Sequence, residues 1–163
     1  MKDRTALALL SPEIGAGGLS GKTIIESSSG NTAKALGMIA HNFDLKVESV
    51  TSRSKVPEVS QLLQILGIKL IHVPGMSECP DPRDPYNPLK FIESRISQDP
   101  DAYFWTNQYL NPKNPAIHSN TTAVEIEDDI GIPDYFFSGI GTSGSSGGIA
   151  TYFHTRDPGC SMI

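Results

Sequence analysis

Long apolar runs and basic clusters are missing from this sequence of 163 residues. No apolar stretch approaches the roughly 20 residues that a transmembrane helix needs, so a membrane span is not expected. The 13 Lys and Arg residues are outnumbered by 18 Asp and Glu residues, which gives a formal charge of -5. Because no basic run is available to neutralise a row of phosphates, nucleic acid is excluded as an expected partner.

Cysteine is also scarce, with only Cys79 and Cys160 in the chain. The two lie far apart and show neither CxxC spacing nor a histidine-rich partner, which argues against a disulfide framework and against a metal site. Two inert thiols in a reducing, cytoplasmic compartment fit this usage best. The apolar stretch after Met1–Arg4 is too short for a signal peptide, so no targeting segment is predicted.

Glycine and proline, by contrast, are plentiful, at 15 and 12 residues, and they predict a loop-rich α/β protein. Helix and strand signals alternate along the chain, which is typical of βαβ units and a parallel sheet. Strands are predicted over residues 23–26, 46–51, 69–73, 103–106 and 134–138. Helices are predicted over residues 5–10, 33–41, 57–66, 89–97 and 117–126, the first of them stopped by Ser11 and Pro12.

Two further segments are read from composition alone. The proline-rich stretch 74–88 predicts an extended surface loop, either a mobile lid or a passive insertion. The acidic group at residues 125–129 is interpreted as a solvated helix end.

The segment Gly139–Gly148 consists almost entirely of glycine, serine and threonine and follows an aromatic strand. Small residues allow backbone N–H groups to approach an anion, so this segment predicts a phosphate cradle, with a flexible turn as the alternative. It also contains G-x-G-x-x-G, which keeps a dinucleotide-binding module open as a further hypothesis. A Walker A loop is excluded because no Gly-Lys-Ser/Thr follows.

Two other polar segments follow predicted strands. Glu26–Ala33 is dense in hydroxyls before a helix, and this pattern predicts either a carboxylate-binding pocket or plain capping by Ser28 or Ser29. Asn107–Pro115 could give directional contacts to a planar polar ligand or form a polar turn. His118, shortly after it, is interpreted as structural.

These segments in this order, after Lys2-Asp3-Arg4, closely resemble the cysteine synthase and cystathionine β-synthase family of fold type II pyridoxal phosphate enzymes. Family members show S-V-K-D-R, T-S-G-N-T, N-Q-x-x-N-P-x-N-P-x-x-H and G-x-G-T-G-G-T, and the resemblance runs from Lys2 to about Phe153. It implies a three-layer αβα fold of the tryptophan synthase β-like kind, incomplete here. Residues 1–163 would be one partial enzyme domain, with roughly 20–125 as the small subdomain and the remainder as pieces of the large subdomain.

The resemblance also implies a role for each matching residue. Lys2 would form the Schiff base with the aldehyde of pyridoxal 5'-phosphate and later transfer the proton at the substrate α-carbon. Asn31 would hydrogen-bond the cofactor ring hydroxyl. The substrate carboxylate would be held by Ser28, Ser29, Gly30 and Thr32, assisted by Gln108. The cofactor phosphate would be bound by Gly141, Thr142, Ser143, Gly144 and Ser145.

The sequence departs from the family pattern in several places. The Ser-Val strand before the lysine is absent, the chain ends soon after the phosphate loop, and no residue can be assigned to the pyridine nitrogen. We therefore expect a chain truncated at both ends. Ala33 and Ser143 replace usual glycines, and the tail from His154 to Ile163 departs from the strand that the family has there.

The predicted function is β-replacement on an O-activated L-serine, either cysteine synthase-like or of the branch that condenses O-phosphoserine with glutamate. Glu26–Asn31 together with Trp105–Tyr109 favours the second branch. The expected partners are a small amino-acid substrate and, where the full family fold is present, a second copy in a homodimer. The alternative is a catalytically silent remnant of the scaffold that binds only a small anion or a partner chain.

Overall fold

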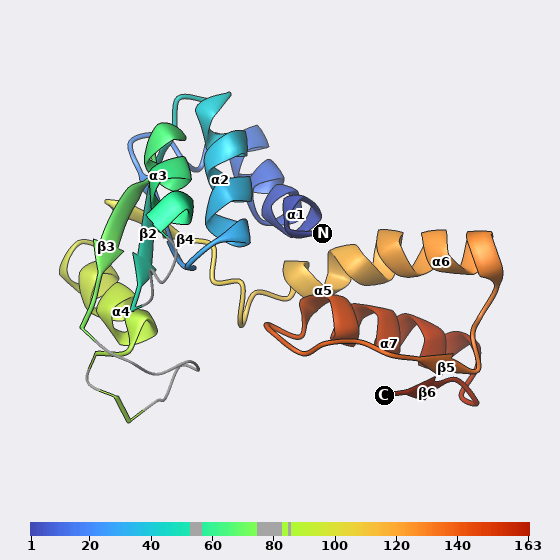
Figure 1. Cartoon of the computed structure of the whole chain (residues 1–163). Coiled ribbons are helices and arrows are strands. Elements are labelled where there is room, and N and C mark those ends of the chain that lie inside the picture. Colours follow the sequence, from blue (N-terminus) through green and yellow to red (C-terminus); the bar gives the residue numbers. More distant parts are fainter. Residues whose placement is uncertain (53–56, 75–82, 85) are drawn as a thin grey trace. The chain divides into compact units, whose positions relative to one another are not determined.

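The computed structural model covers residues 1–163 and describes all of them except residues 53–56, 75–82 and 85 (Figure 1). The chain divides into two units. One, here called the sheet unit, contains Lys2 and Leu10–Asn107; the other, the helical unit, contains Met1, Asp3–Leu9 and Gln108–Ile163. Helix α1 (Lys2–Gly15) contributes residues to both.

The sheet unit is built on four parallel strands in the order β3-β2-β1-β4. The strands are β1 (Thr23–Ser27), β2 (Lys46–Thr51), β3 (Lys69–His72) and β4 (Tyr103–Trp105). They alternate with the helices α2 (Asn31–His41), α3 (Pro57–Ile65) and α4 (Pro88–Gln98). Each strand was predicted to within one residue at either end, because each contains β-branched or aromatic residues and is bounded by polar turns.

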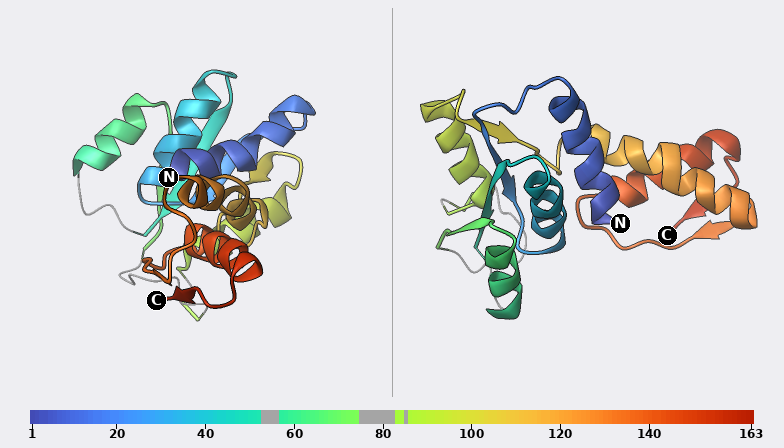
Figure 2. Two further views of the ribbon diagram at one scale, coloured as in Figure 1. Left: turned by 90° about the vertical axis from the view of Figure 1, so that its right-hand side faces the viewer. Right: turned by 90° about the horizontal axis from the view of Figure 1, so that it is seen from above.

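Helices cover both faces of this sheet. Figure 2 shows α2 and α3 on one face and α4 on the other, as right-handed crossovers require when the chain returns from β3 across the sheet to β4. On the α4 face, Ile25, Val50 and Ile92 are buried in one apolar cluster. On β1, the neighbouring Ile24 is also fully buried, so both faces of the central strand are covered, as is typical of parallel sheets.

In the helical unit, three consecutive elements follow Gln108 and form a nearly continuous helix. They are α5 (Lys113–Ile117), a π-helical turn (His118–Thr122) and α6 (Ala123–Ile130). After β5 (Tyr135–Phe136) come α7 (Gly144–Arg156) and β6 (Ser161–Met162), and β6 pairs with β5 in parallel. The core of this part contains Ile149, Phe153 and Cys160, and the Phe136 and Tyr152 rings meet Phe153 edge-on. Cys160 is a free buried thiol, which agrees with the inert interpretation; Cys79 lies outside the described residues.

Several predicted boundaries were wrong. α1 does not stop at Pro12 but runs to Gly15, because proline adopts helical φ and loses only one hydrogen bond. The helix predicted over 117–126 begins at Lys113 and ends at Ile130, so the acidic group lies within it. α7 begins at Gly144, inside the segment predicted as a loop, and a short strand does form in the tail.

The acidic group is only partly a solvated helix end. Glu125 pairs with Arg4 at 2.8 Å, and Glu127 accepts hydrogen bonds from Tyr152 and Arg156, whereas Asp128 and Asp129 are exposed. The predicted lid over residues 74–88 falls largely outside the described residues. Among the helices that are described, none is long and apolar enough to cross a membrane.

Candidate active site

The carboxyl ends of β1 and β4 lie side by side. Ile25 pairs with Trp105, and the N–H of Thr106 donates to the Ile25 carbonyl at 3.3 Å. After β1 the chain passes through α2 on one face, whereas β4 is reached through α4 on the other. Open α/β sheets bind their ligands at such a switch point, outside the carboxyl ends of the strands. The end of β1 is therefore the expected place for chemistry in the sheet unit.

A fully buried carboxylate, that of Glu26, occupies this place. Its Oε1 accepts the N–H of Ser27 at 2.8 Å, and its Oε2 accepts the hydroxyl of Thr106 at 2.5 Å. Both groups donate, as a carboxylate requires, and these bonds offset the cost of burying the charge. Glu26 was included in the predicted segment 26–33 without a role of its own, although a charged residue directly after Ile24 and Ile25 indicates a buried carboxylate.

Lys2 packs with the sheet unit and is half-buried. Burial lowers the pKa of its ammonium group, and the negative charge of Glu26 offsets part of that decrease. A lowered pKa increases the share of neutral amine, which is the nucleophilic form. The lysine singled out in the sequence therefore has a larger share of neutral amine than an unperturbed lysine has at the same pH.

The hydroxyl-rich junction between β1 and α2 carries the predicted carboxylate-binding residues. Ser28 is half-buried, and its Oγ accepts the N–H groups of Gly30 at 3.3 Å and Ala33 at 3.2 Å. The capping interpretation is thus confirmed for Ser28, although the N-cap residue of α2 is Gly30. Thr32 is buried, whereas Ser29 and Asn31 are exposed to solvent.

The helical unit holds the predicted phosphate turn, here defined as residues 141–145. Gly141 is exposed, and a Cβ atom there would meet no other atom within 4 Å. Ser143 adopts the left-handed conformation, with φ of 60°, and the 13-residue helix α7 starts directly after it. The first backbone N–H groups of a helix have no partner within the helix, so this turn can present donors to an anion.

The remaining predicted residue, Gln108, also belongs to the helical unit and is buried. Its backbone carbonyl accepts a hydrogen bond from Nδ2 of Asn114 at 2.7 Å. His118 is buried as well and contacts Thr5 and Thr122, as a structural histidine would. The predicted residues therefore divide between the units: Lys2 and residues 28–32 in the sheet unit, Gln108 and the phosphate turn in the helical unit.

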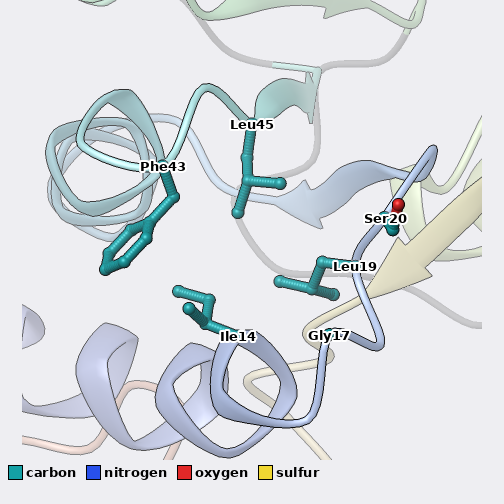
Figure 3. Close-up of a pocket in the computed structure, with 6 residues that line it drawn as sticks. All are labelled: Ile14, Gly17, Leu19, Ser20, Phe43 and Leu45. Atoms are coloured by element: carbon teal, nitrogen blue, oxygen red, sulfur yellow. The ribbon is translucent and has the colours of Figure 1, made fainter.

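An apolar cavity of about 220 Å³ lies elsewhere in the sheet unit (Figure 3). Ile14, Leu19, Phe43 and Leu45 point into it, and Gly17 and Ser20 complete its lining. Because Leu19 precedes β1 and Leu45 precedes β2, this cavity is at the amino ends of the parallel strands, away from the switch point. No predicted site residue lines it.

Curated relatives of this chain include cysteine synthases. Cysteine synthase A of Salmonella typhi is 33% identical over 133 residues, which cover 81% of this chain and 39% of the relative. The cysteine synthase of Helicobacter pylori strain 26695 is 32% identical and matches 100% of this chain and 52% of its own length. The chain therefore spans about half the length of such relatives, or less.

Solved structures of a cysteine synthase and of a cystathionine β-synthase share the fold of this chain. The O-acetylserine-dependent cystathionine β-synthase from Helicobacter pylori superposes with a TM-score of 0.85 at 30% identity, covering 100% of this chain and 52% of that one. The cysteine synthase from Entamoeba histolytica gives a TM-score of 0.81 at 31% identity, with 98% and 46% covered. The predicted fold class, a partial α/β fold of the type II pyridoxal phosphate enzymes, is thereby confirmed.

A family model matches the whole of the given sequence. All residues from 1 to 163 match the family described as pyridoxal-phosphate dependent enzyme, which confirms the resemblance and the cofactor that it implied. The half-buried amine, the hydroxyl-rich junction and the glycine-serine turn all lie inside the matched range. This chain belongs to the pyridoxal-phosphate dependent enzyme family.

Proposed function

We propose that this protein catalyses pyridoxal phosphate-dependent β-replacement on an O-activated L-serine. The observation that carries the proposal is Lys2: burial lowers the pKa of its amine in the unit that also holds the hydroxyl-rich end of β1. The relatives support the reaction class, since they include cysteine synthases and an O-ureido-L-serine synthase, the latter with a TM-score of 0.83 at 28% identity.

The residues present fit the cofactor. Its phosphate needs an anion seat free of bulky side chains, and Gly141 together with the start of α7 offers one. Its aldehyde needs a lysine amine, and the lowered pKa of Lys2 increases the neutral share of that amine. Its ring hydroxyl needs a polar side chain, for which we propose the exposed Asn31. When bound, pyridoxal phosphate supplies an electron sink for negative charge at the substrate α-carbon.

The chain's own groups perform the remaining tasks. The amine of Lys2 accepts the proton from the substrate α-carbon, and the buried charge of Glu26 stabilises the ammonium that results. Ser28, already fixed by two backbone N–H groups, keeps its hydroxyl proton for the substrate carboxylate. Ser29, Gly30 and Thr32 complete that contact, and Gln108 assists.

The choice between a cysteine synthase-like reaction and condensation of O-phosphoserine with glutamate is a matter for assay. We propose a cytoplasmic protein, on the strength of its two cysteines with no disulfide spacing. We also propose a homodimer wherever the full-length family fold is present, with residues 20–125 as the small subdomain. A catalytically silent remnant that binds only a small anion or a partner chain is the second candidate.

The test is binding followed by turnover. Purified protein mixed with pyridoxal phosphate is expected to show a visible absorption band that Lys2→Ala abolishes and Lys34→Ala, a half-buried lysine on α2, retains. Borohydride reduction and peptide mass spectrometry should then locate a pyridoxyl group on Lys2. Release of acetate from O-acetylserine with sulfide, or of phosphate from O-phosphoserine with glutamate, separates the two branches.

Each negative outcome has a definite meaning. A colourless protein, or a band that Lys2→Ala leaves intact, contradicts the assignment of Lys2. A colourless protein favours the silent remnant, whereas a band that depends on Lys2 without turnover of either substrate supports the assignment of Lys2 and contradicts both proposed branches of the reaction.

A further inference from the structure

Asn114 is a buried asparagine in the segment 107–115, for which the sequence predicted either directional contacts to a planar polar ligand or a polar turn. Only 1% of its surface is exposed, and it lies within the helical unit at the start of α5. Its Nδ2 donates to the Gln108 carbonyl at 2.7 Å and to the Thr142 hydroxyl at 3.1 Å, and its Oδ1 accepts the Thr5 hydroxyl at 3.1 Å. A carbonyl can only accept, so the contact with Gln108 fixes which way the amide faces. One side chain thereby joins three separate segments.

The first turn of α7 is shaped around this side chain. A Cβ atom on Gly144 would lie 2.1 Å from Oδ1 of Asn114, 2.4 Å from its Cγ and 2.5 Å from its Nδ2. Such separations are far below van der Waals contact, so only glycine allows Asn114 to sit here. Glycine at position 144 and asparagine at position 114 therefore depend on each other.

Asn114 is itself held by a chain of buried polar groups. The Thr5 hydroxyl donates to Asn114 and therefore accepts from Nε2 of His118 at 3.1 Å. Nδ1 of that histidine lies 2.9 Å from the Thr122 hydroxyl, which accepts from Arg4 at 3.0 Å. Every member from Arg4 to Asn114 thus has its hydrogen-bond partners, and this leaves the amide little freedom to turn.

We propose that Asn114 is a positioning residue that holds the phosphate turn in its binding geometry, through Thr142 and through contact with Gly144. The inference deepens the proposed function and rests on it. Asn114 is buried and does not touch the ligand; it acts by keeping the Thr142 hydroxyl and the first amides of α7 in place. Preorganised donors bind an anion more tightly than donors that must first be ordered.

Ligands with and without a phosphate separate this role from general stability. Dissociation constants of the full chain for pyridoxal phosphate, pyridoxine 5'-phosphate and pyridoxal are measured by calorimetry. For Asn114→Ala we expect about tenfold weaker binding of both phosphate-bearing ligands, the scale of a lost hydrogen bond and a loosened turn, with pyridoxal unchanged. Asn111→Ala is the matched control, since its Oδ1 accepts the Lys113 N–H in the same loop and should leave the phosphate preference intact.

A second variant tests the dependence between positions 114 and 144. Gly144→Ala is expected to displace Asn114 and to weaken the phosphate-bearing ligands to a similar degree. The double variant Gly144→Ala/Asn114→Ala should be no weaker than Gly144→Ala alone, because the clashing side chain is gone. If Asn114→Ala does not fold, Gly144→Ala still reports on the same contact.

The outcomes distinguish the inference from the function beneath it. If the unmodified protein prefers phosphate-bearing ligands and Asn114→Ala keeps that preference, the inference is overturned and the proposed function stands. Independent, multiplicative losses in the double variant overturn it equally. If the unmodified protein shows no preference for a phosphate, both fail together.

Discussion

Two adjacent glycines in α7 offer a sharp test of the packing in the helical unit. A Cβ atom on Gly148 would lie 2.2 Å from the Pro115 carbonyl oxygen and 3.0 Å from Cβ of His118. Gly147, one position earlier, has open space around the same atom. The substitutions Gly147→Ala and Gly148→Ala therefore make the same chemical change on the same helix and differ only in what the methyl group meets.

The expected magnitudes follow from two opposing terms. Alanine in place of glycine in a helix gains about 0.5–1 kcal/mol, so Gly147→Ala should raise the free energy of unfolding by about that much. Overpacking costs about 1–3 kcal/mol. At Gly148 the obstacle is a backbone carbonyl oxygen in α5, which cannot rotate away as the tip of a side chain can. Gly148→Ala should therefore lower the free energy of unfolding by about 1–2 kcal/mol net.

Urea unfolding followed by circular dichroism measures both values against the unmodified chain. The slope of free energy against urea concentration should stay constant, so that the change in midpoint reports stability alone. Similar effects of the two substitutions would refute the reasoning, because they would show that α5 and α7 do not approach as closely as the Gly148 contact requires.

Three further outcomes are expected. Glu26→Gln should lower the pKa of Lys2 further, because a negative charge that raises it is removed; an unchanged Lys2 pKa in an NMR titration would show that Glu26 does not act on this amine. The pKa of Lys2 is lower in the folded than in the unfolded chain. At pH values between these two pKa values the unfolded chain binds more protons than the folded chain, so the free energy of unfolding should rise with pH in that range. Lys2→Met should flatten that rise in urea titrations at several pH values. Asn87→Ala should cost about 1 kcal/mol of unfolding free energy, since Asn87 Oδ1 caps α4 through the Leu89 N–H at 2.8 Å.

Much of the sheet unit could be predicted because its strands are local signals. Ile24 and Ile25 in β1, and Val47 and Val50 in β2, are apolar and buried as expected, and both strands are bounded by turns. The extent of α1 could not be predicted from local rules, since Pro12 is normally a helix stop. Burial of Leu9 and Leu10 stabilises the helix by more than the one hydrogen bond that proline removes.

The identities of the candidate site residues came from motifs, whereas their environments did not. The surroundings of Glu26 depend on β1 pairing with β4, whose contact joins Glu26 to Thr106 across the sheet. The environment of Asn114 depends in the same way on α7 packing against α5. Such pairings are non-local, and no pattern within a window of ten or so residues contains them.

Buried polar groups give the final argument for where function lies. Glu26 and Thr106 in the sheet unit, and Thr5, Asn114 and His118 in the helical unit, are all at least 99% buried. A hydrogen-bonded buried polar pair adds little net stability over a well-packed apolar pair, so stability alone does not account for them. Directional bonds do fix one arrangement of the segments that they join. In the sheet unit those bonds fix the end of β1, near Lys2. In the helical unit they fix the phosphate turn. In both units the buried polar side chains therefore lie where the proposed reaction requires groups to be held in accurate positions.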